Sequence, residues 1–222
     1  MIVAMDGPAG CGKSTIAKLL SERQGFVYIN SGNFYRTIAF AAIECGLGSA
    51  EQLADSAALT NCAKSLEPDY QADGTILLGG RKLGRELRTA EVDAIVAQVS
   101  AVPEIRHIVN AWVRAFARGK DVVVEGRDMT TVVFPDAELK FYLDASVQVR
   151  AGRRFDQGSS SLDLDGIAKN IEMRDKIDRE KEFGALKVSP DARYLDTSGL
   201  TIEDVYSKVY DEILHIREAH GE

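Results

Sequence analysis

The segment GPAGCGKST, residues 7–15, constrains the fold more than any other part of the chain. Its spacing is that of a glycine-rich turn that points successive backbone N–H groups at the oxygens of a di- or triphosphate. The apolar run at residues 2–5 reads as a short buried strand, and the apolar spacing at residues 16–20 indicates an amphipathic helix. We therefore predict a phosphate-binding loop between a strand and a helix.

Three features of this loop have defined chemistry. The helix N-terminus adds about half a positive charge; Lys13 can reach the β- and γ-phosphates, and the Ser14 hydroxyl can hold Mg²⁺. The loop alone does not separate a kinase from a nucleotide-controlled switch or a nucleotide-binding regulatory domain. The predicted nucleotide contacts are Gly7, Pro8, Ala9, Gly10, Cys11, Gly12, Lys13, Ser14 and Thr15.

Composition limits the partners of the chain. The 222 residues, 45% hydrophobic and 27% charged, are typical of one compact enzyme domain with insertions. A net charge of −7 argues against broad binding to nucleic acid or membrane surfaces. The odd number of cysteines, three without metal-ligand spacing, favours the reducing cytoplasm. We find no leader-like segment and no apolar run near 18 residues, so neither secretion nor a membrane span is expected.

Apolar runs that resemble strands alternate with helical patterns along most of the chain. Besides residues 2–5, strands are expected at 26–30, 121–126, 139–145 and 193–198. Apolar residues recur with helical spacing at 105–116 and 205–216. This alternation predicts an α/β doubly wound fold, in which ligands gather at the carboxyl ends of the strands.

Residues 64–87 break the alternation. The pairs Asp73-Gly74 and Gly79-Gly80 read as hairpin turns, so we predict a small antiparallel insertion flanked by helices at 50–64 and 89–100. A second irregular stretch, 156–166, is small and polar. Its composition fits a mobile lid and fits an ordinary solvated loop equally well.

Arginines follow several of the predicted strands. Arg150, Arg153 and Arg154 share one helical face by spacing, as do Arg174, Asp178 and Lys181. Cations that converge where strands end would suit a reaction that brings two phosphate groups together against their repulsion.

Seven runs carry a family resemblance that spans nearly the whole chain. In order they are DGPAGCGKST, NSGNFYR, LRTAEV, QVSAVPEIR, EGRDMTTVVFPDAELKFYLDAS, RAGRR and RDKIDR, and together they resemble the bacterial cytidylate kinases of the nucleoside monophosphate kinase group. The phosphate loop is widely shared, whereas GRD followed by TVVFPDA is specific.

This resemblance implies a P-loop kinase fold with a five-stranded parallel sheet flanked by helices. It implies a core of residues 1–30 and 107–222 with a lid at about 155–166, and a nucleoside-monophosphate-binding domain of residues 31–106 with the insertion at about 64–100. The implied reaction transfers the γ-phosphoryl group of ATP, with Mg²⁺, to CMP or dCMP. The implied protein is a cytoplasmic monomer.

The resemblance also implies roles for single residues. Lys13 and Mg²⁺ at Ser14 would hold the donor, and Arg36 and Arg127 would grip the CMP phosphate. The residues expected to bridge the phosphates or cover ATP are Arg150, Arg154 and Arg174. Asp128 and Arg106 would read cytosine, and Asp178 with Arg174 would face the ribose. Ser31 and Lys181 complete the expected substrate contacts.

Some positions depart from the family pattern. Lys181 stands where an arginine is usual, which puts bidentate phosphate alignment in doubt, and Ala97 replaces a serine expected to touch the base. Lesser departures are Asn30, Glu125 and Thr130. Cys11 beside Lys13 suggests an oxidation-sensitive thiol, against the alternative of a small residue tolerated at a variable loop position.

Other functions stay open on sequence alone. A kinase for AMP, UMP or a metabolite hydroxyl would share the phosphate loop. A GTPase switch would usually need an Asn-Lys-x-Asp guanine-reading run, which the chain does not contain. A regulatory ATP-binding domain would not require Arg36, Arg127 and Arg174.

Overall fold

A computed structural model of the chain describes residues 1–158 and 162–221. The chain divides into two compact units, one made of Met1–Phe26 with Asp121–Glu222 and the other of Val27–Lys120. Residues 159–161, in the middle of the expected lid, lie outside the described residues. Helices extend into both ends of that expected irregular stretch, because one ends at Asp156 and the next begins at Leu164.

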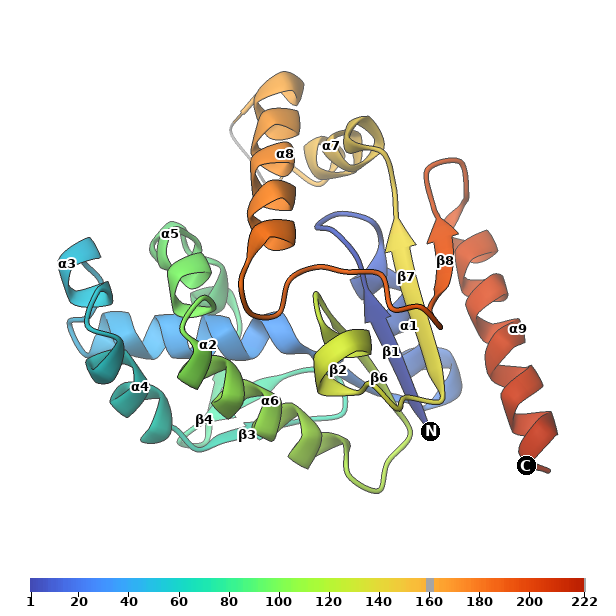
Figure 1. Ribbon diagram of the computed structural model, residues 1–222, viewed down its shortest axis with the longest axis horizontal. Helices are drawn as coiled ribbons and strands as arrows, with labels where there is room; N and C mark the ends of the chain where they lie inside the picture. The colour runs from blue at the N-terminus through green and yellow to red at the C-terminus, as the bar shows by residue number, and fades with distance from the viewer. Residues whose placement is uncertain (159–161, 222) are drawn as a thin grey trace. The chain divides into compact units, whose positions relative to one another are not determined.

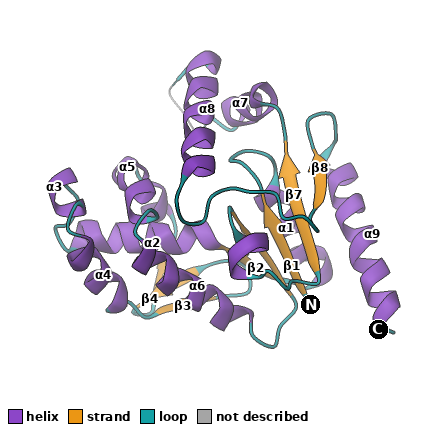
Figure 2. Cartoon of the chain, in the orientation of Figure 1, coloured by secondary structure: helices purple, strands orange, loops and turns teal. Residues whose placement is uncertain are grey.

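The main sheet has five strands in the order β2-β6-β1-β7-β8, which confirms the predicted α/β fold and its five strands. The pairings β1–β6, β1–β7 and β7–β8 are all parallel. Strands β1, β7 and β8 can be followed in Figure 2. All residues of β6 are buried, as expected for a β-branched run with both faces covered. The strand bounds are Ile2–Asp6 (β1), Val27–Asn30 (β2), Val122–Gly126 (β6), Leu139–Asp144 (β7) and Arg193–Asp196 (β8).

Some helices of the first unit pack on this sheet, and two others pack on each other. Helix α1 packs on β6 and α9, while α7 packs on α8 (Figure 1). The α7–α8 contact is a small apolar cluster of Ala151, Ile167 and Ile171. The bounds are Lys13–Gln24 (α1), Val147–Asp156 (α7), Leu164–Glu180 (α8) and Ile202–His220 (α9), with a π-helical turn, η2, at Met129–Val133.

Gly7 allows the phosphate loop to lie directly against β7. Its φ is +146°, and a Cβ at this position would lie 2.0 Å from the carbonyl oxygen of Leu143. Gly12, at φ +104°, precedes the first turn of α1 in the left-handed region. A larger side chain would therefore collide with β7 at position 7 and strain the backbone at position 12.

The second unit is a helical cluster with a small antiparallel sheet. Helix α2 packs on α4, α5 and α6, and Phe34 stacks on Tyr70 and Phe116. Strands β3, β4 and β5 pair antiparallel, which confirms the predicted insertion and its two turns. The bounds are Ser31–Glu44 (α2), Ala50–Leu53 (α3), Ser56–Lys64 (α4), Pro68–Tyr70 (β3), Ile76–Leu78 (β4), Arg81–Leu83 (β5), Arg85–Arg88 (η1), Ala90–Val99 (α5) and Pro103–Ala117 (α6).

One predicted helix of this unit is wrong. Residues 50–64 were expected to form a single helix, but they form α3 and α4 with a break between them. Asp55 causes the break because its carboxylate accepts a hydrogen bond from the Ala58 N–H at 2.9 Å and so begins a new helix. The neighbouring prediction at 89–100 is confirmed by α5, which Thr89 caps.

Among the described helices, none is both long enough and apolar enough to cross a membrane.

Candidate active site

The carbonyl groups of the phosphate loop are turned toward buried cations. Lys13 is only 4% exposed, and its Nζ donates to the carbonyl oxygens of Gly7 and Pro8, both at 2.8 Å. Arg150 donates through Nη1 to the Ala9 carbonyl at 3.2 Å. In a trans peptide the C=O and the N–H point in opposite directions. These bonds therefore fix the peptide planes on the two sides of Ala9, and with them the directions of the Ala9 and Gly10 N–H groups.

Thr197 and Lys13 enclose Cys11. The Thr197 hydroxyl donates to the Cys11 carbonyl at 3.0 Å and so fixes the orientation of the Cys11–Gly12 peptide. The Cys11 thiol is fully buried, with the Nζ of Lys13 at 3.5 Å from its Sγ. In this state an oxidant in solvent has no access to the thiol, so burial favours the interpretation of Cys11 as a packing residue.

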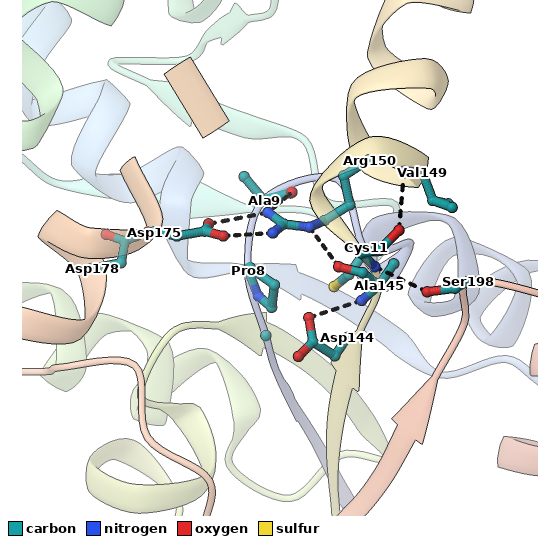
Figure 3. A network of polar contacts seen from close by, with 12 residues as sticks. Pro8, Ala9, Cys11, Asp144, Ala145, Val149, Arg150, Asp175, Asp178 and Ser198 are labelled. Carbon is teal, nitrogen blue, oxygen red and sulfur yellow. Dashed lines mark hydrogen bonds and ion pairs between the residues drawn. The ribbon is translucent and has the colours of Figure 1, made fainter. Parts of the chain in front are cut away.

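Arg150 is held between the loop and α8, as Figure 3 shows. Its Nη1 and Nη2 form a two-pronged ion pair with the Asp175 carboxylate, at 3.1 and 2.5 Å, and its Nε donates to the Ala145 carbonyl at 2.8 Å. Neighbouring Arg153 instead donates to the hydroxyl and carbonyl of Thr197. The arginines of α7 thus contact different parts of the first unit, although they share one helical turn.

A second ion-pair network lies where β6 ends. The Nε of Arg127 donates to Oδ2 of Asp178 at 2.7 Å, and the Nζ of Lys181 donates to Oδ1 at 2.7 Å. The Arg127 side chain is 23% exposed, and in the described part of the chain its Nη2 donates no hydrogen bond. Arg127 is thus fixed at Nε by Asp178, and its Nη1 donates to the Gly126 carbonyl at 3.4 Å, which leaves Nη2 to donate to an anion.

Asp178 is strongly held as a carboxylate. Burial alone would raise its pKa, but the charges of Arg127 and Lys181 and their hydrogen bonds outweigh burial and hold the pKa at about 2. Its side chain is 7% exposed, so solvent screens the interaction little. The carboxylate therefore stabilises the folded state at neutral pH.

This lowered pKa predicts an acid-sensitive contribution to stability. Because the folded pKa lies below the ordinary value, the contribution is fully present above that value and is lost as pH falls toward 2. We expect the difference in unfolding free energy between the wild type and an Asp178→Asn variant to shrink by about 1 kcal/mol from pH 5 to pH 3. Urea titrations at the two pH values measure it, and a constant difference would contradict the pairing.

Asp6 fixes the turn that follows β6, and the sequence did not indicate this role. The fully buried carboxylate accepts from the N–H groups of Met129 and Thr130 and from the Thr130 hydroxyl, at 2.6–2.9 Å. Burial raises the pKa of Asp6. Thr130, one of the departures from the family pattern, thus supplies a donor of its own. Asp128, which precedes this turn, is also buried.

The predicted residues of the second unit lie on two of its helices. Ser31 is the first residue of α2, and Arg36, one turn later, donates to the Leu87 carbonyl and the Asp93 carboxylate. Arg106, on α6, donates to the Ser100 carbonyl at 3.2 Å and lies over the Tyr35 ring. Both arginines are buried, so packing orients their guanidinium groups.

Two predicted arginines lie on the helical pair of the first unit. Arg154 is half-buried on α7, and Arg174 is exposed on α8, directly before Asp175. Sequence reasoning missed Asp175, Thr197 and Asp93. Asp175 lies on α8 three residues before Asp178, and nothing in the sequence named Arg150 as its partner.

Ser14 suits the Mg²⁺ that accompanies a nucleoside triphosphate. It lies exposed in the first turn of α1, directly after Lys13, and offers a hydroxyl oxygen, the ligand type that Mg²⁺ prefers.

The chain is similar to known proteins over nearly its whole length. The sequence profile described as cytidylate kinase matches residues 3–215. A cytidylate kinase of Borrelia turicatae is 41% identical over 92% of this chain and 92% of its own length. One of Vibrio cholerae is 38% identical over 96% and 95%. An uncharacterised protein of Eubacterium ventriosum has a similar fold, with a TM-score of 0.54 at 11% identity, over 96% of this chain and 98% of that one.

Proposed function

Because the chain belongs to the cytidylate kinase family, we infer that it transfers the γ-phosphoryl group of ATP to CMP or dCMP, giving CDP or dCDP and ADP. One observation of the structure carries this function: a single turn of α8 holds both ion-pair networks. Asp175 anchors Arg150 against the phosphate loop, and Asp178 anchors Arg127. A donor cradle and a phosphate-binding arginine beside it are what transfer between two phosphates requires.

The donor side of the site consists of the phosphate loop with its cations. Lys13 neutralises charge on the β- and γ-phosphates, while the inward-facing loop N–H groups bind their oxygens. The Ser14 hydroxyl would hold the Mg²⁺ that accompanies ATP, and the bound ion would supply neutralisation of charge during transfer. Arg150, Arg154 and Arg174 complete the donor side.

The acceptor side uses Arg127 and Arg36 for the phosphate of CMP. Asp178 orients Arg127, Lys181 adds a point charge, and Ser31 contributes a hydroxyl. The attacking oxygen belongs to a phosphate that is already ionised at neutral pH. No side chain has to act as a general base, so alignment and charge neutralisation supply the catalysis.

Cytosine is selected by Asp128 and Arg106 in this proposal. The carboxylate of Asp128 accepts from the exocyclic amine, and Arg106 donates to the ring acceptors; Asp178 accepts from ribose hydroxyls. UMP would place O4 against the Asp128 carboxylate, at a cost of about 1–3 kcal/mol. The alanine at position 97 offers the base no hydroxyl, so we expect CMP to be preferred over UMP without full exclusion.

An Asp128→Asn variant tests this reading of the base. The amide can donate to O4 of uracil, so the ratio of kcat/KM for CMP to that for UMP should fall about tenfold or more. Parallel kinetics with the two monophosphates measure the ratio. If the ratio stayed at the wild-type value while the variant remained folded, Asp128 would be a structural carboxylate and not a reader of the base.

The remaining assignments follow the family pattern. We propose that residues 31–106 form the monophosphate-binding domain, that the stretch at about 155–166 closes over ATP, and that the protein acts as a monomer in the cytoplasm. Small-angle scattering with and without both nucleotides would report closure and oligomeric state together.

The direct test is release of ADP from Mg²⁺-ATP with CMP, dCMP, UMP or AMP as acceptor. Selective turnover with the cytidine nucleotides is the expected result. Turnover with another monophosphate alone would keep the kinase but remove the base assignment. The absence of any acceptor-dependent release of ADP would favour a binding or regulatory domain.

A further inference from the structure

Asp175 has no assigned role, yet its carboxylate holds the guanidinium of Arg150 against the phosphate loop. It is 5% exposed on α8, and its two carboxylate oxygens accept from Nη1 and Nη2 of Arg150, which is 2% exposed (Figure 3). Because both groups are buried and the fork is two-pronged, the guanidinium has one well-defined orientation.

That orientation is transmitted to the loop. The same Nη1 that contacts Asp175 also donates to the Ala9 carbonyl, and Nε is fixed by the Ala145 carbonyl at the end of β7. The Ala9 carbonyl and the Gly10 N–H belong to one peptide plane and point in opposite directions. Gly10 has φ +84°, in the left-handed region, and lies outside any helix or strand. These contacts therefore hold its part of the loop.

We propose that Asp175 is a positioning residue for the donor nucleotide, which acts through Arg150 and the Ala9 carbonyl to aim the Gly10 N–H at the ATP phosphates. The proposal rests on the proposed function and deepens it. It also distinguishes two roles of Arg150, support of the phosphate loop and direct contact with the phosphates. Because Asp175 keeps this arginine against the loop, Arg150 supports the loop and does not itself move to the phosphates.

An Asp175→Asn variant distinguishes these roles. An amide presents one acceptor and one donor to a guanidinium that only donates, so the fork is lost and the guanidinium, still bonded to the Ala145 and Ala9 carbonyls, is less firmly oriented. We expect the dissociation constant of a non-hydrolysable ATP analogue and KM for ATP to rise about tenfold, as for loss of one charge-assisted contact. KM for CMP should stay within about twofold. Unchanged or tighter binding of the analogue would overturn the proposal.

Asp178→Asn is the matched comparison, since the residue lies three positions later on the same buried face of α8. It should raise KM for CMP through Arg127 and leave binding of the ATP analogue within about twofold. Glu172→Gln, an exposed change on the same helix, should alter neither constant. If both aspartate variants raised both constants together, the helix would only be loosened and the proposal would fail.

A paired replacement removes stability as an explanation. Buried ion pairs replaced by apolar residues of similar volume often keep the stability of the fold. The double variant Arg150→Met with Asp175→Leu should therefore recover most of the melting temperature lost in Asp175→Asn, while its affinity for the ATP analogue stays low. Recovery of both would show a purely structural pair and overturn the proposal. A wild type that neither binds the analogue nor turns over CMP would instead contradict the proposed function.

Discussion

Replacement of Lys13 by methionine is expected to lower kcat by about 10²–10³-fold, the largest effect of any single change in the donor site. The buried ammonium group bonds two loop carbonyls and supplies the positive charge nearest to the expected β- and γ-phosphates. Methionine preserves the volume of the side chain but removes that charge and both hydrogen bonds. Steady-state kinetics with Mg²⁺-ATP and CMP measure the loss.

The variant should remain folded, so its loss of rate can be measured separately from its change in stability. The carbonyls of Gly7 and Pro8 lose their donor, which costs about 1–3 kcal/mol in total. Lys18→Met, an exposed change on the same helix α1, is the matched control and should keep full activity. A Lys13→Met enzyme with more than a tenth of the wild-type kcat would contradict the assigned role.

The fold was largely predictable from sequence because its strongest signals are local. Short apolar runs, such as residues 122–124 within β6, indicate buried parallel strands, and the glycine spacing of residues 7–15 permits few backbone paths. The hairpin turns of the insertion were equally local signals. The break between α3 and α4 was missed because one capping aspartate competes with a continuous helical pattern.

The site was less predictable, since its precision comes from pairs distant in sequence. Asp6 and Thr130 are 124 positions apart, and Arg150 and Asp175 are 25 apart. Charge and helical spacing drew attention to several arginines, and family resemblance assigned them to nucleotides, an assignment that stays a prediction. Neither could reveal that Arg150 is already bound on the loop side by a buried carboxylate, because that contact depends on how α7 packs on α8.

On the acceptor side, Arg127→Lys is expected to lower kcat/KM for CMP by about 10²-fold or more. In the wild type, Nε bonds Asp178 while the opposite edge of the guanidinium stays available to a phosphate. A lysine has one nitrogen centre, so pairing with Asp178 and alignment of a phosphate compete for it. Alanine would be a poorer test, because it would leave Asp178 buried with only Lys181 as its ion-pair partner.

The control for this change is Arg193→Lys, at a surface ion pair with Glu212 whose partners are 41% and 33% exposed. Exposed pairs contribute little, so activity should be unchanged. Binding of a non-hydrolysable ATP analogue should be retained in Arg127→Lys, since the phosphate loop keeps Lys13 and Arg150. An Arg127→Lys enzyme that no longer bound the ATP analogue but kept its KM for CMP would place Arg127 on the donor side. Only the ligand whose binding is lost can have depended on the second edge of the guanidinium.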